Sequence, residues 1–253
     1  VTLALEDDQS PEGISGRIKE IDTHIPYASV KAIYHFVDSS HGAPLEHHLY
    51  RKRMKRKGGP KRGTKNPADK TKVSIEKRSK RANNRTEFGH LEGDFIESGR
   101  DGTGSLLVLV ERKTRYPFIM YTEDKATLTV NNLIVGCLKE MPIKSITLDN
   151  DVSFQKHEEL SELIDAVVYF THPYTSSDKG TVENRNGRIR EFVPKGCDIS
   201  QIPRETILKA EQYLRTRYMK CLGFRTPEEA YQQELQKVTC GRIKKTTPLG
   251  VSF

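Results

Sequence analysis

The chain has 253 residues, with 42 lysine and arginine residues against 34 aspartate and glutamate residues, a formal net charge of +8. With 35% hydrophobic and 30% charged residues it has the composition of a globular protein, which excludes a disordered chain. No apolar run approaches the roughly 20 residues of a transmembrane helix. The start, VTLALEDDQS, has no signal-peptide pattern and no initiator methionine, so we expect a fragment or a processed chain.

The N-terminal region, residues 1–50, is predicted to contain two short helices between residues 10 and 38. Ser10 is suited to cap the first helix and Pro11 to begin it, while apolar residues recur at helical spacing in both segments. Two helices joined by a turn are typical of a helix-turn-helix that binds DNA, and equally of an ordinary helical hairpin. The candidate groove-facing residues, which could also be ordinary exposed helix positions, are Ser29, Lys31 and His35.

Basic residues are concentrated in the next segment, residues 51–86, which is predicted to be a linker. Between Arg51 and Arg85 there are 16 lysines and arginines and two acids, whereas the rest of the chain has 26 basic and 32 acidic residues. Such a local concentration indicates an arm that binds a polyanion, although a solvated tail or a targeting patch has the same composition. Its candidate DNA contacts are Lys52, Arg53, Lys55 and Arg56.

From Phe88 the pattern changes to strands. Three strand-like runs, GHLEGDFIES, SLLVLVERKT and FIMYTED, are separated by short turns. A helix at 127–140, the strand SITLD, a helix at 157–164, the strand AVVYF and a helix at 177–192 follow. This order predicts an α/β fold over residues 87–198, a ribonuclease-H-like mixed sheet flanked by helices. Residues 199–253 are predicted to be a helical tail whose helix ends near Tyr231.

Three acidic residues are candidates for a metal-dependent active site. Asp94 lies inside an apolar strand, where an acid is costly unless it is paired, and Asp149 directly follows the apolar run SITL. Glu183 lies in the last predicted helix among basic residues. Carboxylates that converge from neighbouring elements can hold divalent metal ions for phosphoryl transfer. Glu92 and Asp151 stay open as alternatives because each lies two residues from a candidate and points the same way in an extended chain.

The motifs GHLEGDFI, TLDNDVSF and HPYTSSDKGTVENRNGRIREFVPKGCDIS resemble the DDE transposases of the insertion-sequence family numbered thirty. The similarity is nearly residue for residue in ENRNGRIREFVPKG. It extends to SPEGISGRIK with VKAIYHFV, which is similar to the family's helix-turn-helix, and to KCLGFRTPEEAY. Together these segments cover most of the chain from Ser10 to Tyr231. The chain departs from the family at Leu91, at Asp151, at Gln155 and in the stretch LRTRYMKCLGF.

By this resemblance the three family carboxylates fall on Asp94, Asp149 and Glu183. They are expected to hold two Mg²⁺ or Mn²⁺ ions for cleavage and transfer of DNA strands, with a possible assisting role for His172. The expected DNA contacts around the last helix are Lys179, Arg185, Asn186, Arg188 and Arg190. The expected partner is double-stranded DNA, both terminal inverted repeats and target, bound by a homodimer or a larger assembly in the nucleoid of a bacterial cytoplasm.

Other functions remain open from the sequence alone. A transposase-derived regulator would bind DNA with idle carboxylates, and a related nuclease or integrase would share the fold and the metal ions. An integrase is expected to carry a zinc-binding His/Cys module, whereas the four cysteines here form no CxxC pair and predict reduced thiols. A basic structural protein of the nucleoid is disfavoured by the strand-rich central region.

Overall fold

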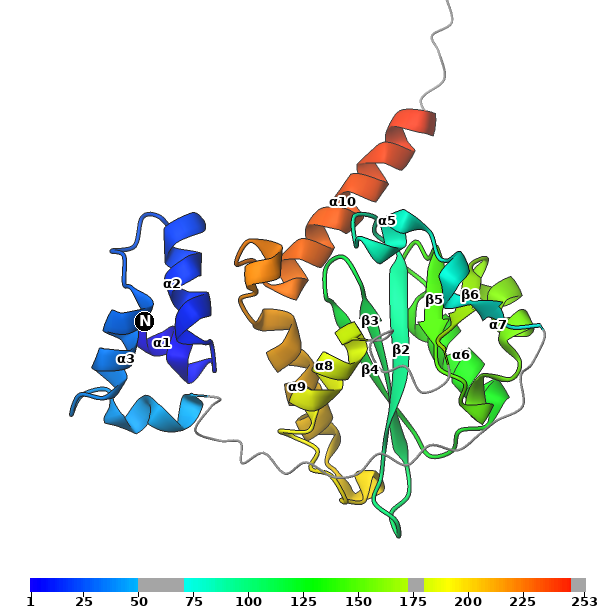
Figure 1. Ribbon diagram of the computed structural model, residues 1–253, viewed down its shortest axis with the longest axis horizontal. Helices are drawn as coiled ribbons and strands as arrows, with labels where there is room; N and C mark the ends of the chain where they lie inside the picture. Colours follow the sequence, from blue (N-terminus) through cyan, green and yellow to red (C-terminus); the bar gives the residue numbers. More distant parts are fainter. Residues whose placement is uncertain (50–70, 173–179, 247–253) are drawn as a thin grey trace, which may run out of the picture.

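The computed structural model describes residues 1–49, 71–172 and 180–246, and a six-stranded mixed sheet forms its centre (Figure 1). The strands are β1 (Val73–Ser74), β2 (His90–Glu97), β3 (Ser105–Glu111), β4 (Pro117–Thr122), β5 (Ser145–Leu148) and β6 (Val167–Phe170). Their order across the sheet is β1-β6-β5-β2-β3-β4. β2, β3 and β4 form an antiparallel meander, and β5 continues the sheet parallel to β2. The predicted ribonuclease-H-like fold class is confirmed.

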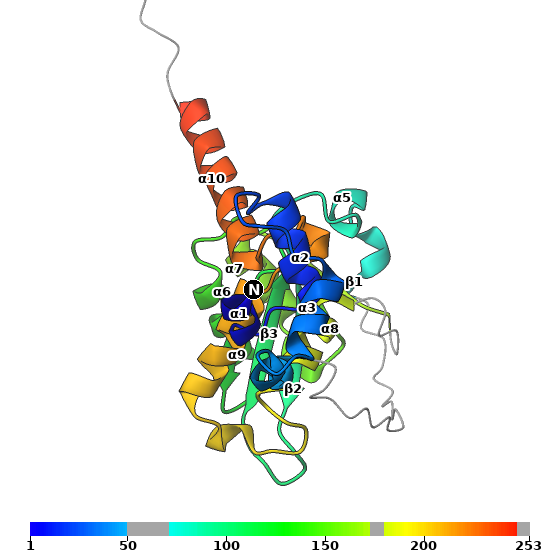
Figure 2. The same cartoon turned by 90° about the vertical axis from the view of Figure 1, so that its left-hand side faces the viewer.

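Helices cover both faces of the sheet (Figures 1 and 2). α6 (Thr127–Cys137) and α7 (His157–Ile164) pack on one face, and α8 (Gly180–Ile189) and α9 (Arg204–Thr216) pack on the other. Each face has its own apolar core, because alternate side chains of a strand point to opposite sides. Along β2, Leu91 and Phe95 belong to the first core and Ile96 to the second. Glu92 and Asp94 therefore lie on the side of the sheet that α8 covers.

The centre of the sheet is tightly packed around Gly93 of β2. A Cβ atom at this position would lie 2.6 Å from a methyl carbon of Leu148 and 2.9 Å from one of Leu109. Glycine is required here because the two leucines of the neighbouring strands β5 and β3 fill the space above it. This packing holds β2 and β5 side by side. One predicted active-site aspartate, Asp94, lies within β2, and another, Asp149, directly follows β5.

The N-terminal unit contains α1 (Thr2–Glu6), α2 (Pro11–Glu20), α3 (Val30–Val37) and the 3₁₀ helix η1 (Ala43–His48) around a small core of its own. The two predicted helices are confirmed. The Ser10 hydroxyl accepts a hydrogen bond from the Gly13 amide at 3.1 Å, and the helix begins at Pro11 as the capping pattern indicates. Residues 21–29 separate α2 from α3, a longer connection than the tight turn of a helix-turn-helix, whose assignment stays a prediction.

Two expectations about the connecting segments need correction. The C-terminal end of the predicted linker is folded, since residues 71–86 contain β1, the 3₁₀ helix η2 (Ile75–Lys77) and α5 (Lys80–Asn83). Ile75 and Ala82 are buried there, so a few well-placed apolar residues anchor an otherwise basic segment. The tail helix does not end near Tyr231. It is divided into α9 and α10 (Pro227–Thr246), joined through the 3₁₀ helix η6 (Lys220–Leu222).

The N-terminal unit packs on the segment between α9 and α10. The Gln9 side chain, 4% exposed, donates to the Thr216 carbonyl at 2.9 Å and accepts from the Tyr218 amide at 2.8 Å. Arg17 pairs with Glu229 at 2.6 Å. These contacts lie within and beside the stretch LRTRYMKCLGF, which departs from the family resemblance. Among the described residues, no helix is long and apolar enough to span a membrane.

Replacing Gly16 by alanine is expected to destabilise the protein by about 1–3 kcal/mol, the usual effect of overpacking. A Cβ atom on Gly16 would lie 2.1 Å from a ring carbon of Phe224, so the ring has to leave its place. Gly→Ala in an exposed helix normally has the opposite sign and stabilises by up to about 1 kcal/mol. The matched control is the exposed Gly136 of α6, where a Cβ atom would have no atom of the described residues within 4 Å.

Urea denaturation of both variants measures the two effects. If Gly16→Ala stabilises the protein as much as Gly136→Ala does, then α2 does not pack against Phe224 in solution.

Candidate active site

Asp94 and Asp149 are brought together by the register of two parallel strands. Glu92 of β2 is the partner of Thr147 of β5. This is the last pair of the ladder; Asp94 lies two residues further along β2, and Asp149, two residues beyond Thr147, directly follows β5. Because side chains two residues apart share a face, both aspartates lie on the α8 side of the sheet. Both side chains are half-buried.

α8 contacts Asp94 through Asn186. The Asn186 side-chain amide donates to Asp94 Oδ2 at 2.8 Å. Asn186 lies three residues after the exposed Glu183, so the two share a flank of the helix. The Asn186 Oδ1 atom is buried and has no hydrogen-bond partner among the described residues. A buried oxygen without a donor, next to a carboxylate, is the kind of ligand atom that a hard cation accepts.

The chemistry of the three carboxylates suits divalent metal ions, whereas their arrangement does not form a complete metal site among the described residues. Asp94, Asp149 and Glu183 offer the oxygen ligands that Mg²⁺ and Mn²⁺ take. In the part of the chain that the structure describes, no group of three or more His, Cys, Asp or Glu side chains is placed to hold a metal ion. The residues that lead into α8, 173–179, lie outside the described part. The two aspartates and the Glu183 flank of α8 are thus close in the fold without forming a closed ligand set.

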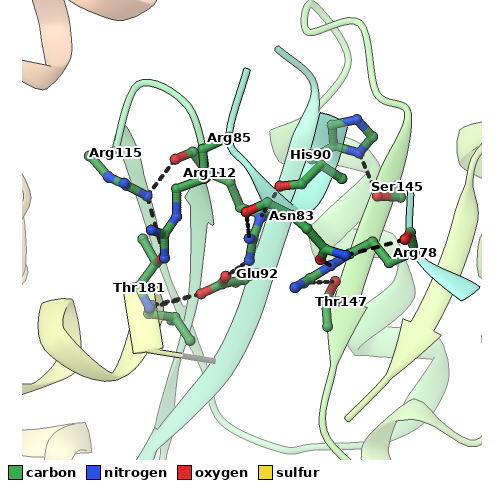
Figure 3. A network of polar contacts seen from close by, with 12 residues as sticks. Arg78, Asn83, Arg85, His90, Glu92, Arg112, Arg115, Ser145, Thr147 and Thr181 are labelled. Carbon is green, nitrogen blue, oxygen red and sulfur yellow. Dashed lines mark hydrogen bonds and ion pairs between the residues drawn. The ribbon is translucent and has the colours of Figure 1, made fainter. Parts of the chain in front are cut away.

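Glu92, one of the two alternatives, has a structural role (Figure 3). Its side chain is 1% exposed and forms an ion pair with Arg112. Its second oxygen accepts hydrogen bonds from the backbone amides of Thr181 at 3.0 Å and Val182 at 3.1 Å. Both oxygens are therefore engaged, and Glu92 anchors the first turn of α8 to the centre of the sheet.

Asp151, the other alternative, is also engaged locally. Its Oδ1 atom accepts from the Ser153 amide at 2.8 Å and caps the 3₁₀ helix η3 (Val152–Phe154), while Oδ2 pairs with Lys125 at 2.9 Å. Burial opposes the charge of Asp151, but the hydrogen bonds from Ser153 and Lys125 outweigh it and lower the pKa of the carboxyl group. Lys125 also pairs with Glu97 at 2.6 Å.

The predicted DNA contacts of α8 have different surroundings. Arg185 is 4% exposed, and its Nη2 atom donates to Met219 Sδ at 2.8 Å. Arg188 pairs with Glu191 at 3.2 Å, and Arg190 donates to the Glu97 carbonyl at 2.9 Å. Arg185 therefore differs from the expected exposed contact, because it lies on the side of the helix that packs against the segment following α9.

The remaining predicted residues are divided between the N-terminal unit and segments outside the described part. Lys31 and His35 are exposed on α3, whereas the Ser29 hydroxyl caps this helix by accepting from the Ala32 amide at 3.1 Å. His172 contacts Glu76 at 3.1 Å. Five predicted DNA contacts lie outside the described residues: Lys52, Arg53, Lys55, Arg56 and Lys179.

Sequence reasoning missed Arg112 and the polar network around it. Arg112 donates to Glu92 and also to the Ala82 carbonyl at 3.1 Å, which ties α5 to the sheet. Arg78, beyond β1, donates to the Thr147 hydroxyl at 3.2 Å and extends the network to β5 (Figure 3). The signal in the sequence was the position of Arg112 directly after Glu111 at the end of an otherwise apolar strand, where a charge must be paired if buried.

Several insertion-sequence transposases are similar to this chain over most of its length. It is 34% identical over 231 residues to the transposase for insertion sequence element IS4351 of Bacteroides fragilis, a match that covers 88% of this chain and 69% of that protein. The chain therefore belongs to the insertion-sequence transposases. No protein-family model matches its sequence.

Two further insertion-sequence transposases are similar in sequence to most of this chain. The probable transposase for insertion-like sequence element IS1161 of Streptococcus salivarius is 34% identical over 221 residues, covering 85% of this chain and 61% of that protein. Transposase InsI for insertion sequence element IS30C of Escherichia coli strain K12 is 29% identical over 245 residues, covering 90% of this chain and 62% of that protein. The predicted family is thus confirmed, and this transposase chain spans between 61% and 69% of the length of these relatives.

Among solved structures, the crystal structure of the catalytic core domain of BIV integrase resembles part of this transposase. The TM-score is 0.47 and the sequence identity 17%, over 59% of this chain and 97% of that domain.

Proposed function

We propose that the chain cleaves DNA strands at the ends of an insertion sequence and transfers them to a target, with Asp94, Asp149 and Glu183 as its catalytic carboxylates. The observation that carries the proposal is that Asp94 and Asp149 each lie two residues beyond Glu92 and Thr147, which are paired in two adjacent parallel strands, and that Asn186 of α8 donates to Asp94. Support comes from the family, whose similar members are named as transposases.

The three carboxylates would hold two divalent metal ions, Mg²⁺ or Mn²⁺, which when bound polarise a phosphodiester and lower the pKa of an attacking hydroxyl or water. The protein's own contribution is rigid positioning. Glu92 fixes the first turn of α8 to β2, and Asn186 orients the Asp94 carboxylate. These two contacts set the distance between the helix that carries Glu183 and the strands that carry the aspartates.

DNA would be held by basic residues on both sides of this centre. Arg188 and Arg190 lie half-buried at the end of α8, and Lys31 and His35 are exposed on α3 of the N-terminal unit. Guanidinium and ammonium groups bind backbone phosphates and position a duplex without reading its sequence. Because two ends of an element must be joined to one target, the active form is proposed to be a dimer or a larger assembly on DNA.

Cleavage of a labelled duplex that contains the element's terminal repeat tests this function. Nicking at the repeat end is expected with Mg²⁺ and none is expected in excess chelator, while binding of the duplex persists in both. Binding without any Mg²⁺- or Mn²⁺-dependent nicking would contradict the proposed activity and favour a DNA-binding regulator.

Replacing Asn186 by alanine is expected to lower cleavage by about 10- to 100-fold at limiting Mg²⁺, the usual effect of losing a residue that orients a metal ligand. The loss is expected to be partly recovered at high Mg²⁺, since the variant weakens metal binding and leaves the carboxylates in place. Titration of the cleavage rate with Mg²⁺ measures this.

The matched control is Asn132→Ala on the exposed face of α6, which should cleave as the parent protein does. A loss in Asn186→Ala that is independent of Mg²⁺ concentration would contradict a positioning role for this side chain.

A further inference from the structure

The side chains of Arg85 and Arg115 meet at Thr181 in the first turn of α8 (Figure 3). The Thr181 hydroxyl accepts from Arg85 Nη2 at 3.2 Å and from Arg115 Nη1 at 3.4 Å. Glu183 lies two residues beyond Thr181, and at about 100° per residue it points to the opposite flank of the helix. The arginine cluster is therefore separate from the carboxylates, although the same helix carries parts of both.

The positive charge of this cluster is not balanced. Neither Arg85 nor Arg115 forms an ion pair with a carboxylate, and the same holds for Arg185 on the next turn of α8, as far as the described residues show. The buried acid Glu92 accepts from the Thr181 amide, but its two oxygens are already engaged by Arg112 and by the first amides of α8. The backbone amides of the helix start are thus occupied, and only side-chain donors remain to bind an anion.

Arg185 lacks acceptors most clearly. Its Nε atom is buried without a hydrogen-bond partner among the described residues, and the acceptor at its Nη2 atom is the weakly accepting sulfur of Met219. Burial, reinforced by the charges of Arg115 and Arg217, lowers the pKa of Arg185 to about 10. A buried guanidinium without a carboxylate is costly, and an anion held by Arg85 and Arg115 would offset part of its positive charge.

The backbone holds the two outer arginines in an uncommon conformation. Arg85 has φ of 58° and Arg115 has φ of 64°, both in the left-handed region that is unfavourable for residues other than glycine. Arg85 follows α5 and Arg115 lies in the turn between β3 and β4. Two separate segments thus adopt the same unfavourable conformation and direct their guanidinium groups to one hydroxyl, as is common at binding sites.

We propose that Arg85 and Arg115 form a binding site for a backbone phosphate of DNA, with Thr181 as its polar floor and with the buried Arg185 of the same helix adding positive charge. The inference rests on the proposed function, because it takes DNA as the ligand. The planar guanidinium fork matches the oxygens of a phosphate group. Arg115 also donates to the Arg112 carbonyl at 2.5 Å, but the acceptors of both arginines are neutral, and a phosphate would supply the negative charge. The site would hold a DNA strand on one flank of α8 while the carboxylates act on the other.

Salt-dependent binding of a fluorescein-labelled DNA duplex of mixed sequence, followed by anisotropy, tests the site through Arg85→Gln and Arg115→Gln. Each variant is expected to lower the slope of log Kobs against log salt concentration by about 0.9, the value for one lost phosphate contact. The double variant is expected to lose no more than about 0.9, since both side chains serve one phosphate. The control is Arg100→Gln, an exposed arginine in the turn between β2 and β3, whose slope should match the parent.

Thermal unfolding by circular dichroism confirms that the variants remain folded; Arg85 is exposed, and its replacement leaves the core intact. Folded Arg85→Gln and Arg115→Gln proteins with the parental slope would overturn the phosphate site. An equal loss in Arg100→Gln would also overturn it, by showing a general effect of charge. If the parent protein binds no DNA, the proposed function itself fails; parental binding and nicking with unchanged slopes would reject the site alone.

Discussion

Replacing Asp149 by asparagine is expected to reduce Mg²⁺-dependent strand cleavage by about a thousandfold or more and to leave DNA binding unchanged. The substitution keeps the shape of the side chain and removes the negative charge that a divalent cation requires. A metal ion contributes several kcal/mol to the stabilisation of charge in the transition state, and about 4 kcal/mol corresponds to a thousandfold in rate. Asparagine also keeps an oxygen that can accept from the Asp151 amide, as Asp149 does at 3.2 Å.

The rate of nicking of a terminal-repeat duplex, together with its binding affinity, measures this effect. Asp151→Asn is the matched control, because Asp151 caps η3 and pairs with Lys125. Its cleavage is expected to stay within about tenfold of the parent, the equivalent of 1.4 kcal/mol. If the Asp149→Asn protein still cleaves DNA, or if only the Asp151→Asn protein loses cleavage, then Asp149 is not the second catalytic carboxylate.

Replacing Glu92 by glutamine is expected to lower the free energy of unfolding by about 3–5 kcal/mol, the usual result of breaking a buried ion pair by removing one partner. Arg112 is 4% exposed and would keep its charge without a carboxylate. The backbone amides of Thr181 and Val182 would also face a neutral side chain in place of an anion. Because these amides begin α8, the variant should also lose part of its cleavage activity.

Urea denaturation at neutral pH measures the change in stability. The same substitution at the exposed ion pair between Glu159 and Lys156, whose side chains are 52% and 53% exposed, is the control. Exposed pairs contribute about 0–1 kcal/mol, so Glu159→Gln should have little effect. Equal stability of the Glu92→Gln and Glu159→Gln proteins would contradict the anchoring role of Glu92.

Much of the secondary structure could be predicted because its signals are local. The cap at Ser10 and the proline after it located the start of α2, and the alternating and apolar runs located β2, β3 and β5. The residues from 71 to 86 were assigned to a linker because they are mostly basic. Their fold depends on Ile75 and Ala82, which become buried only when the segment meets the sheet.

In the candidate site, too, the local signals could be read from the sequence, whereas contacts between distant segments could not. Asp94 and Glu92 have the same sequence signal, since both are acids on one face of an apolar strand. What separates them is Arg112, which is 20 positions away in the sequence and reaches Glu92 only across the sheet. The meeting of Arg85 and Arg115 at Thr181 was equally hidden, because the three residues come from segments with no common motif.

The amino-acid sequence by itself indicated the strand and helix pattern, because periodicity and capping act within short stretches of chain. The resemblance of its motifs indicated the family and, through it, the three candidate carboxylates. Only the tertiary structure decided which buried acid anchors α8, where the N-terminal unit packs, and which arginines surround Thr181. These depend on pairing between distant segments, and a charge or a glycine in a sequence does not reveal the partner that will lie against it. The ion pair with Arg112 thus identifies Glu92, two residues from Asp94, as a structural anchor.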